Sequence, residues 1–159
     1  MPTEVAIGIV GCAKRKRSEP CAARDLYISP LFQQALRYAE TVCDATYVAS
    51  ALHDLVPLDR VIAPYDRTLK VYGKRLRMAW GDRVVEKLAG LHRSGTIRLL
   101  VLAGADYVEP IRAASIHRRW TVEDPLRGRS VAGRLQWLRA AMTAVLPVSA
   151  EAITPAAPT

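Results

Sequence analysis

The sequence lacks the features of several common protein classes. It has only three cysteines (Cys12, Cys21 and Cys43) and no C-x-x-C pair, so neither a disulfide framework nor a zinc site is indicated. No apolar run approaches the roughly 20 residues that cross a membrane as a helix. The first residues, MPTEVAIGIVG, lack the charged segment, long apolar segment and cleavage site of a secretion signal. We therefore expect a cytoplasmic protein with no membrane partner.

Two familiar nucleotide-binding motifs are absent as well. The first apolar run is followed by Gly11-Cys12-Ala13-Lys14-Arg15-Lys16-Arg17, which has one glycine and four consecutive cations and is called the basic loop below. This loop matches neither the P-loop pattern nor the dinucleotide-binding pattern. No group of residues has metal-ligand spacing, so the sequence predicts neither a metal nor a cofactor.

What the chain has in excess is positive charge. It contains 23 lysines and arginines against 15 aspartates and glutamates, which gives a net charge of +8. Such an excess favours anionic partners such as nucleic acid or nucleotides, although a soluble basic protein without such a partner has the same composition. Main-chain N–H groups of the basic loop, assisted by Lys14, suit a phosphate; the other interpretation is a solvated loop.

Alternating strand and helix patterns predict the fold. Continuous apolar runs indicate strands at residues 5–10, 45–50 and 97–103, with short extended pieces at 60–63 and 120–122. Helical spacing and capping residues indicate helices over residues 30–42, 74–93, 108–117 and 131–146, and loops over 14–24 and 52–57. This alternation implies an α/β fold, a compact three-layer α/β/α sandwich with a mainly parallel sheet of about four strands. Residues 1–146 are expected to form a single domain and residues 147–159 a flexible Pro/Ala-rich tail.

The helical patterns also predict which side chains face the core. The helix over residues 74–93 is expected to bury Leu76, Trp80, Val84, Leu88 and Leu91. The last helix, capped by Ser130, is expected to bury Val131, Leu135, Leu138, Met142 and Val145. Trp120 and Trp137 also have core-like spacing, which favours packing over base stacking.

Small and polar residues gather at the predicted strand ends. Open parallel sheets bind ligands outside the carboxyl ends of their strands, so these residues are candidates for a site. The four ends supply Gly11, Cys12 and Lys14; Ser50 and His53; Tyr65 and Asp66; and Gly104, Asp106 and Tyr107.

Several of these residues have more than one interpretation. Cys12 is either a small buried hydrophobic residue or a nucleophilic thiolate favoured by nearby cations. His53 is either an acid or base that works near pH 7 or a loop histidine bonded to a carbonyl group. Asp66 and Asp25 each suit a general base, an orienting group or a turn cap. Asp106 equally suits the first turn of a helix.

Together, these segments resemble a bacterial and phage domain family of uncharacterised function that is grouped with the YaaA-like peroxide-stress proteins. The similar segments are IGIVGCAKRK (7–16), ARDLY with SPLF (23–32), SALHDLVP (50–57), IAPYDRTL (62–69), VLAG (101–104) with Tyr107 and Pro110, and PL (125–126) with GRLQWL (133–138). The resemblance spans residues 5–140. The strand-end positions and the resemblance together give a candidate set of substrate- or phosphate-binding residues: Gly11, Cys12, Lys14, Lys16, Tyr27, Ser29, Ser50, Gly104 and Tyr107.

Two positions depart from the family pattern. The second-strand motif of the family reads Ser-Ala-Lys-His-Gly-Leu, and here Leu52 and Asp54 stand in place of the lysine and the glycine. The first change removes any anion contact that the lysine makes. The second change adds a negative charge beside His53.

The resemblance implies biology related to DNA or nucleotides. YaaA-like proteins are associated with DNA binding and with protection against oxidative damage, and the sandwich is similar in outline to DNA glycosylases and nucleoside deoxyribosyltransferases. We therefore expect an enzyme that acts on a nucleotide, nucleoside or nucleic-acid base by N-glycosidic cleavage or transfer. Asp66 or Asp25 would be the catalytic carboxylate, and His53 or Tyr65 the donor to the departing base. The alternatives are a non-catalytic DNA-binding stress protein and a partner-binding scaffold.

Overall fold

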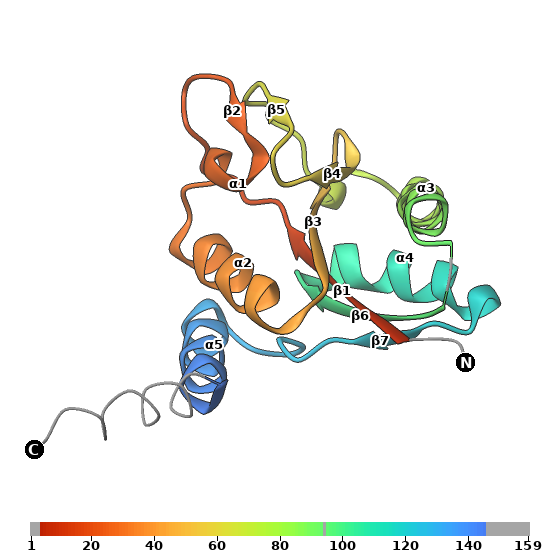
Figure 1. The fold of residues 1–159 in the computed structure, drawn as a ribbon. Helices are drawn as coiled ribbons and strands as arrows, with labels where there is room; N and C mark the ends of the chain where they lie inside the picture. The colour runs from red at the N-terminus through yellow and green to blue at the C-terminus, as the bar shows by residue number, and fades with distance from the viewer. Residues whose placement is uncertain (1–3, 94, 146–159) are drawn as a thin grey trace, which may run out of the picture.

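The structure is a computed structural model that describes residues 4–93 and 95–145. Its main sheet has the order β4-β3-β1-β6-β7, formed by β1 (Glu4–Gly11), β3 (Ala45–Ser50), β4 (Asp54–Pro57), β6 (Thr96–Leu102) and β7 (Thr121–Glu123). β1 pairs in parallel with β3 and β6, and β6 pairs in parallel with β7, whereas β4 is antiparallel to β3 (Figure 1). The predicted α/β fold with a mainly parallel sheet is confirmed, with five strands in that sheet.

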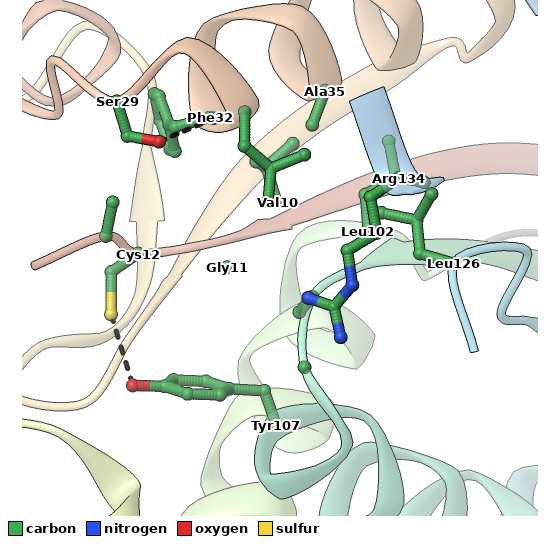
Figure 2. Close-up of a pocket in the computed structure, with 14 residues that line it drawn as sticks. Val10, Gly11, Cys12, Ser29, Phe32, Ala35, Leu102, Tyr107, Leu126 and Arg134 are labelled. Atoms are coloured by element: carbon green, nitrogen blue, oxygen red, sulfur yellow. Dashed lines mark hydrogen bonds between the residues drawn. The ribbon is translucent and has the colours of Figure 1, made fainter. Parts of the chain in front are cut away.

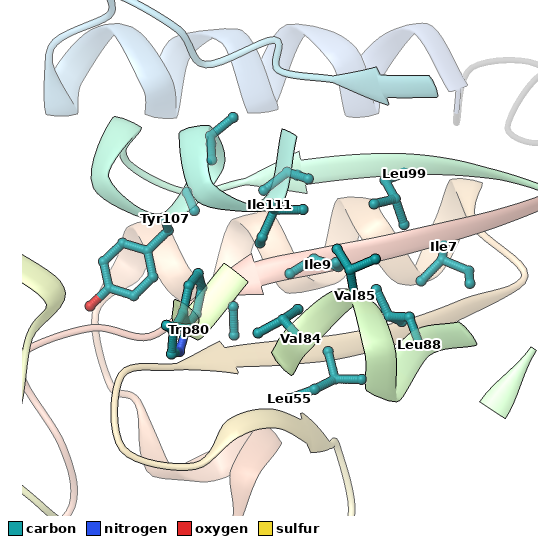
Figure 3. Packing of buried hydrophobic residues seen from close by; sticks show 14 of the residues in the cluster. Ile7, Ile9, Leu55, Trp80, Val84, Val85, Leu88, Leu99, Tyr107 and Ile111 are labelled. Carbon is teal, nitrogen blue, oxygen red and sulfur yellow. The ribbon is translucent and has the colours of Figure 1, made fainter. Parts of the chain in front are cut away.

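Helices cover both faces of the main sheet. α2 (Pro30–Val42) and α5 (Val131–Val145) lie on one face, and α3 (Lys74–Leu91) and α4 (Ala105–Ser115) lie on the other (Figure 1). Ile7 and Ile9 of β1 pack among Trp80 and Val84 of α3 (Figure 3), whereas Val10 belongs to the cluster beneath α2. β1 is therefore buried on both faces, which explains its continuous apolar sequence.

β4 corrects the prediction of a loop over residues 52–57. The segment turns sharply after β3, pairs back along it and buries Leu55 and Val56 on opposite faces of the sheet. Such a short edge strand gives no clear periodic signal, because two apolar residues fit a loop or a strand equally well. Pro57 ends the strand at the edge of the sheet, where a missing N–H is tolerated.

Two further short segments form a small sheet outside the main one. β2 (Cys21–Ala22) pairs antiparallel with β5 (Val61–Ile62), and the one-turn helix α1 (Ala23–Leu26) follows β2. The extended piece predicted at residues 60–63 thus belongs to this small sheet, and residues 14–24, predicted as a loop, contain β2 and the start of α1. Sequence patterns do not determine which strands pair, because pairing depends on contacts far apart in the chain.

The helix ends also differ from the prediction. α4 begins at Ala105 and contains Pro110, and a short 3-10 helix, η2 (Ile116–Arg118), follows it; a second one, η1 (Leu69–Val71), precedes α3. Trp80, Val84, Leu88 and Leu138 are buried as predicted. Four residues predicted to face the core are exposed instead: Leu76, Leu91, Val131 and Val145. All four lie in the first or last turn of their helix, where the partner layer no longer covers the apolar stripe.

None of the described helices combines the length and apolarity that a membrane crossing requires. The flexible tail predicted for residues 147–159 lies outside the described residues.

A glycine sets the distance between α3 and α4. A Cβ atom placed on Gly81 would overlap the carbonyl group of Pro110 and lie 2.7 Å from its Cβ, whereas one placed on Gly90 of the same helix meets nothing within 4 Å. We expect Gly81→Ala to lower the free energy of unfolding by about 1–2 kcal/mol, because overpacking outweighs the gain in helix propensity. Gly90→Ala should raise it by about 0.5 kcal/mol. Urea unfolding of both variants measures the difference, and equal stabilities would contradict this packing.

Candidate functional site

The parallel strands of the main sheet end at one edge, and a cavity lies there between β1 and β6. After β1 the chain adds β3 on one side of β1, and later it adds β6 on the other side. The strand order therefore reverses between β1 and β6. Crevices at such a switch point are the usual ligand sites of open α/β sheets. The cavity has a volume of about 100 Å³ (Figure 2). Its lining combines strand-end residues with side chains of three helices: Val10, Gly11, Cys12, Ala13, Ser29, Leu31, Phe32, Ala35, Leu102, Ala103, Gly104, Tyr107, Leu126 and Arg134.

Two glycines shape the floor of this cavity. A Cβ atom on Gly11 would lie 2.7 Å from the Cβ of Ala103, so glycine allows the ends of β1 and β6 to approach closely. Gly104 precedes the first turn of α4 and provides no side-chain cap for it. Tyr107 N–H donates to the Gly104 carbonyl oxygen over 3.0 Å, so the N–H groups of Ala105 and Asp106 are the ones that lack an intrahelical partner by geometry and make the start of α4 suitable for an anion.

Arg134 is the cationic residue of the cavity lining. Its side chain extends from α5 toward Leu102 and Leu126 (Figure 2), and its Nε donates a 3.2 Å hydrogen bond to the carbonyl oxygen of Arg129. Sequence reasoning did not single out Arg134, because an arginine in an amphipathic helix is usually part of its solvated face. The one available signal is its place in the segment GRLQWL, which belongs to the family resemblance.

Beside the cavity, at the end of β3, three hydroxyl groups form a hydrogen-bonded chain. The Oη atoms of Tyr27 and Tyr65 are 2.6 Å apart, and the Oγ of Ser50 donates to Tyr65 Oη over 2.7 Å. Ser50 Oγ also accepts from the main-chain N–H groups of Leu52 and His53, at 3.2 and 3.0 Å. The turn after β3 therefore fixes the serine, and the serine in turn orients Tyr65.

A further tyrosine contact lies in the lining of the cavity itself. Cys12 Sγ lies 3.4 Å from Tyr107 Oη (Figure 2). The main-chain N–H of Leu69 donates to the same hydroxyl over 3.4 Å. Burial raises the pKa of Tyr27, Tyr65 and Tyr107, and the nearby Cys12 thiol adds to each increase. All three hydroxyls consequently remain protonated at neutral pH. We refer to Cys12, Tyr27, Ser50, Tyr65 and Tyr107 as the tyrosine cluster.

Lys16 covers the tyrosine cluster from the basic loop. Its Nζ lies 4.5 Å from the ring centre of Tyr65 and 5.7 Å from that of Tyr27, within the range of cation–π attraction. Burial lowers the pKa of Lys16, while the nearby Cys12 and Asp66 partly oppose this shift. The loop is attached to the following segment by main-chain hydrogen bonds on both sides of Lys16, from Arg17 to Leu26 and from Ile28 to Arg15. Lys14 remains exposed.

His53 also packs against Tyr65. The two rings meet edge to face with their centres 5.4 Å apart. Burial, with a contribution from Arg60, lowers the pKa of His53, so the imidazole is neutral at pH 7. The side chain therefore retains one N–H donor and one acceptor nitrogen beside the ring of Tyr65.

The backbone conformation at residue 54 explains why an aspartate can stand where the family motif has glycine. The φ of 64° at Asp54 lies in the left-handed region, where the glycine of the family motif fits freely and where aspartate is tolerated better than most residues. Two hydrogen bonds from Arg83, at 2.9 and 3.2 Å, and the ammonium group of Lys87 at 3.8 Å balance its carboxylate. The negative charge added beside His53 is thus compensated by α3.

The predicted carboxylates lie in different places. Asp66 is exposed on the loop after β5, in a shallow hollow with Arg67 and Thr68, and close enough to Lys16 to influence its pKa. Asp25 lies on α1 in a separate surface hollow lined by Arg24, Gln33, Gln34, Leu36, Arg37 and Glu40, so the structure does not bring it to the cavity. Asp106 occupies the first turn of α4, and Ser29 caps α2 by accepting from the N–H of Phe32 at 3.3 Å.

These features define the protein class: a doubly wound α/β protein with a cavity at its topological switch point. The profile of a family of unknown function (DUF6884) matches residues 7–140, and the chain belongs to this family. No curated protein and no solved structure matches the chain.

Proposed function

We propose that this protein binds a nucleotide in the crevice between β1 and β6. We propose further that it cleaves the N-glycosidic bond of the nucleotide, either by hydrolysis or by transfer of the glycosyl group to a second nucleophile. The observation that carries the proposal is that two sites of different chemistry lie side by side at one edge of the sheet. A cavity with Arg134 and the uncapped start of α4 suits a phosphate, and the adjoining tyrosine cluster suits a sugar and a base.

The phosphate would be anchored by charge and by main-chain groups. Arg134 supplies a planar guanidinium group, the side chain best suited to bind a phosphate through two parallel hydrogen bonds. The exposed lysine and arginines of the basic loop add a positive field at the entrance. Apolar lining residues such as Leu31 and Phe32 limit the water around the anion and strengthen these contacts.

The reaction would take place over the tyrosine cluster. In hydrolysis, the oxygen of a water molecule bonds to C1′ of the sugar while the C1′–N bond breaks and its electron pair passes to the base nitrogen. Asp66 would accept the proton that the water loses, and Tyr65 or His53 would donate a proton or hydrogen bond to the departing base. In transfer, a second nucleophile replaces the water. Lys16 and the half-buried ring of Tyr65 offer a cationic and aromatic surface for the base, while the buried Tyr27 supports Tyr65 from beneath through its hydroxyl.

Turnover assays test this proposal directly. The purified chain is incubated with each ribo- and deoxyribonucleoside 5′-monophosphate, and chromatography measures released base and sugar phosphate. Release of base that follows enzyme concentration supports the reaction. If calorimetry detects binding of a nucleotide but no base is released from any nucleotide or modified duplex, the protein is a binder and the reaction is wrong.

Arg134 allows a sharper test of the phosphate site. We expect Arg134→Gln to weaken binding of a nucleoside 5′-monophosphate by about 10- to 100-fold, because a charge-assisted hydrogen bond contributes about 1.5–3 kcal/mol. Affinity for the unphosphorylated nucleoside should stay the same. Arg139→Gln, at an exposed position on the same helix, is the matched control. Equal losses for nucleotide and nucleoside in calorimetry would place the phosphate elsewhere.

A second candidate function is non-catalytic binding of DNA, as the resemblance to YaaA-like proteins suggests. The exposed cations Lys14, Arg15 and Arg17 of the basic loop favour it. Binding through several phosphates gives an affinity that falls steeply with salt concentration, roughly in proportion to the number of phosphates contacted. Mobility-shift assays over a salt series, with charge reversal of these three residues, separate this function from a cavity that binds one nucleotide.

A further inference from the structure

A second cavity adjoins the first at the end of β7. It has a volume of about 250 Å³ and shares Ala103 and Arg134 with the cavity between β1 and β6. Two carboxylates and a second arginine complete its charged lining, namely Glu109, Asp124 and Arg127. This cavity was not expected from the sequence, because Asp124 follows a strand of only three residues.

The charged groups around this cavity are incompletely paired with one another. Arg112 lies 3.8 Å from Asp124 and 3.9 Å from Glu109, and Arg127 lies 4.0 Å from Glu109, so each contact is longer than a hydrogen bond. By contrast, arginine–carboxylate pairs elsewhere in the molecule, such as Arg98 with Glu123, are 2.9–3.3 Å long.

Asp124 and Arg112 are the least satisfied of these groups, because Asp124 Oδ1 and Arg112 Nε each lack a hydrogen-bond partner among the described residues. The side chain of Asp124 is only 7% exposed. Burial raises the pKa of its carboxyl group, against the opposing effect of Arg112 and Arg127. A buried carboxylate oxygen without a partner is costly, and an N–H or O–H group of a ligand would remove that cost.

The position of Asp124 along the sheet edge indicates what such a ligand must be. Ser50, the cavity with Arg134, and Asp124 follow the ends of β3, of β1 and β6, and of β7 in that order. Adjacent strands are about 4.8 Å apart, so the ends of β3 and β7 are separated by about 14 Å, with the phosphate site midway. One nucleoside with its base at the tyrosine cluster and its phosphate at Arg134 leaves the Asp124 side of the phosphate unfilled.

We infer that the ligand is a phosphodiester, with one nucleoside at the tyrosine cluster and a neighbouring nucleoside whose hydrogen-bond donor faces Asp124. This inference rests on the proposed function and names its substrate class: linked nucleotides, as in an oligonucleotide, in place of a free mononucleotide. The donor is either the 2′-hydroxyl of the neighbouring ribose or an amino group of its base, which have the same chemistry toward a carboxylate.

The test compares binding of nucleoside 5′-monophosphates with that of 3′,5′-linked dinucleoside monophosphates by calorimetry, in ribo and 2′-deoxy forms. The wild-type chain is expected to bind a dinucleotide about tenfold more tightly than the mononucleotide. Asp124→Asn should lower the affinity for the dinucleotide about three- to tenfold and leave the affinity for the mononucleotide unchanged. An unchanged mononucleotide affinity also shows that the variant is folded. Glu123→Gln, an exposed neighbour paired with Arg98, is the matched control and should change neither affinity.

The outcomes separate this inference from the function on which it rests. If dinucleotides bind no more tightly than mononucleotides, or if Asp124→Asn weakens both equally, the inference is wrong while nucleotide binding stands. If the wild-type chain binds no nucleotide, both are wrong. Loss of the Asp124 effect with 2′-deoxy dinucleotides assigns the donor to the ribose, and its persistence assigns the donor to the base.

Discussion

Replacing Asp66 with asparagine is expected to slow release of base from the substrate by about 10²- to 10⁴-fold, the usual contribution of a positioned acid or base. The amide keeps the size and polarity of the side chain but cannot accept a proton from the attacking water. Asp66 lies at the rim of the tyrosine cluster next to Lys16, so the substitution should alter the rate without altering the phosphate site. Single-turnover kinetics with saturating enzyme measure the effect.

Asp82→Asn is the matched control for this substitution, since Asp82 is an exposed aspartate on α3 that lines none of the cavities and hollows described above. It should leave the rate unchanged. A rate for Asp66→Asn within a factor of two of the wild-type rate would remove Asp66 from the reaction. Because Asp25 lies in a separate hollow on α1, another group would then have to act as the base.

At alkaline pH the protein is expected to lose stability steeply because of the tyrosine cluster. Burial raises the pKa of Tyr27, Tyr65 and Tyr107 in the folded state above the value of about 10 that they have when unfolded. Above pH 10 the folded state therefore binds more protons than the unfolded state, and stability falls as pH rises. Each group accounts for about 1.4 kcal/mol at pH 11, so the three together remove about 4 kcal/mol, a large part of the 5–15 kcal/mol typical of a domain.

Urea unfolding at pH 8, 10 and 11 measures this loss, and absorbance at 295 nm reports tyrosinate formation. Tyr107→Phe should make the stability fall less steeply above pH 10, whereas Tyr72→Phe, at a half-buried position outside the cluster, should not. If the three tyrosines of the cluster ionise near pH 10 while the chain remains folded, the hydroxyls are not buried as described.

The core strands and helices could be predicted because their signals are local. β1 and β6 are continuous apolar runs, α2 begins at a Ser-Pro pair, and α3 repeats its buried residues every three or four positions. The errors occurred at short or terminal segments. β4 and β5 have too few residues to show a period, and the exposed Leu76 and Val131 lie where a helix extends past its partner.

The candidate site was only partly predictable for a similar reason. The rule that ligands bind at strand ends identified Gly11, Cys12, Ser50, Gly104 and Tyr107, because strand ends can be located from the sequence. It did not identify Arg134 or Asp124. Arg134 comes from the middle of a covering helix, and Asp124 becomes a buried strand-end residue only through pairing of β7 with β6.

By itself, the sequence determined the α/β class, the basic character and the strand-end loops, because composition and periodicity act within short stretches of chain. The tertiary structure alone decided which strands are neighbours, and therefore that β1 and β6 enclose the cavity. It also decided that Tyr27, Ser50 and Tyr65 share hydrogen bonds and that Asp25 stays apart from them. Such contacts depend on how distant segments pack, and packing is a property of the whole chain, which no short stretch of it records.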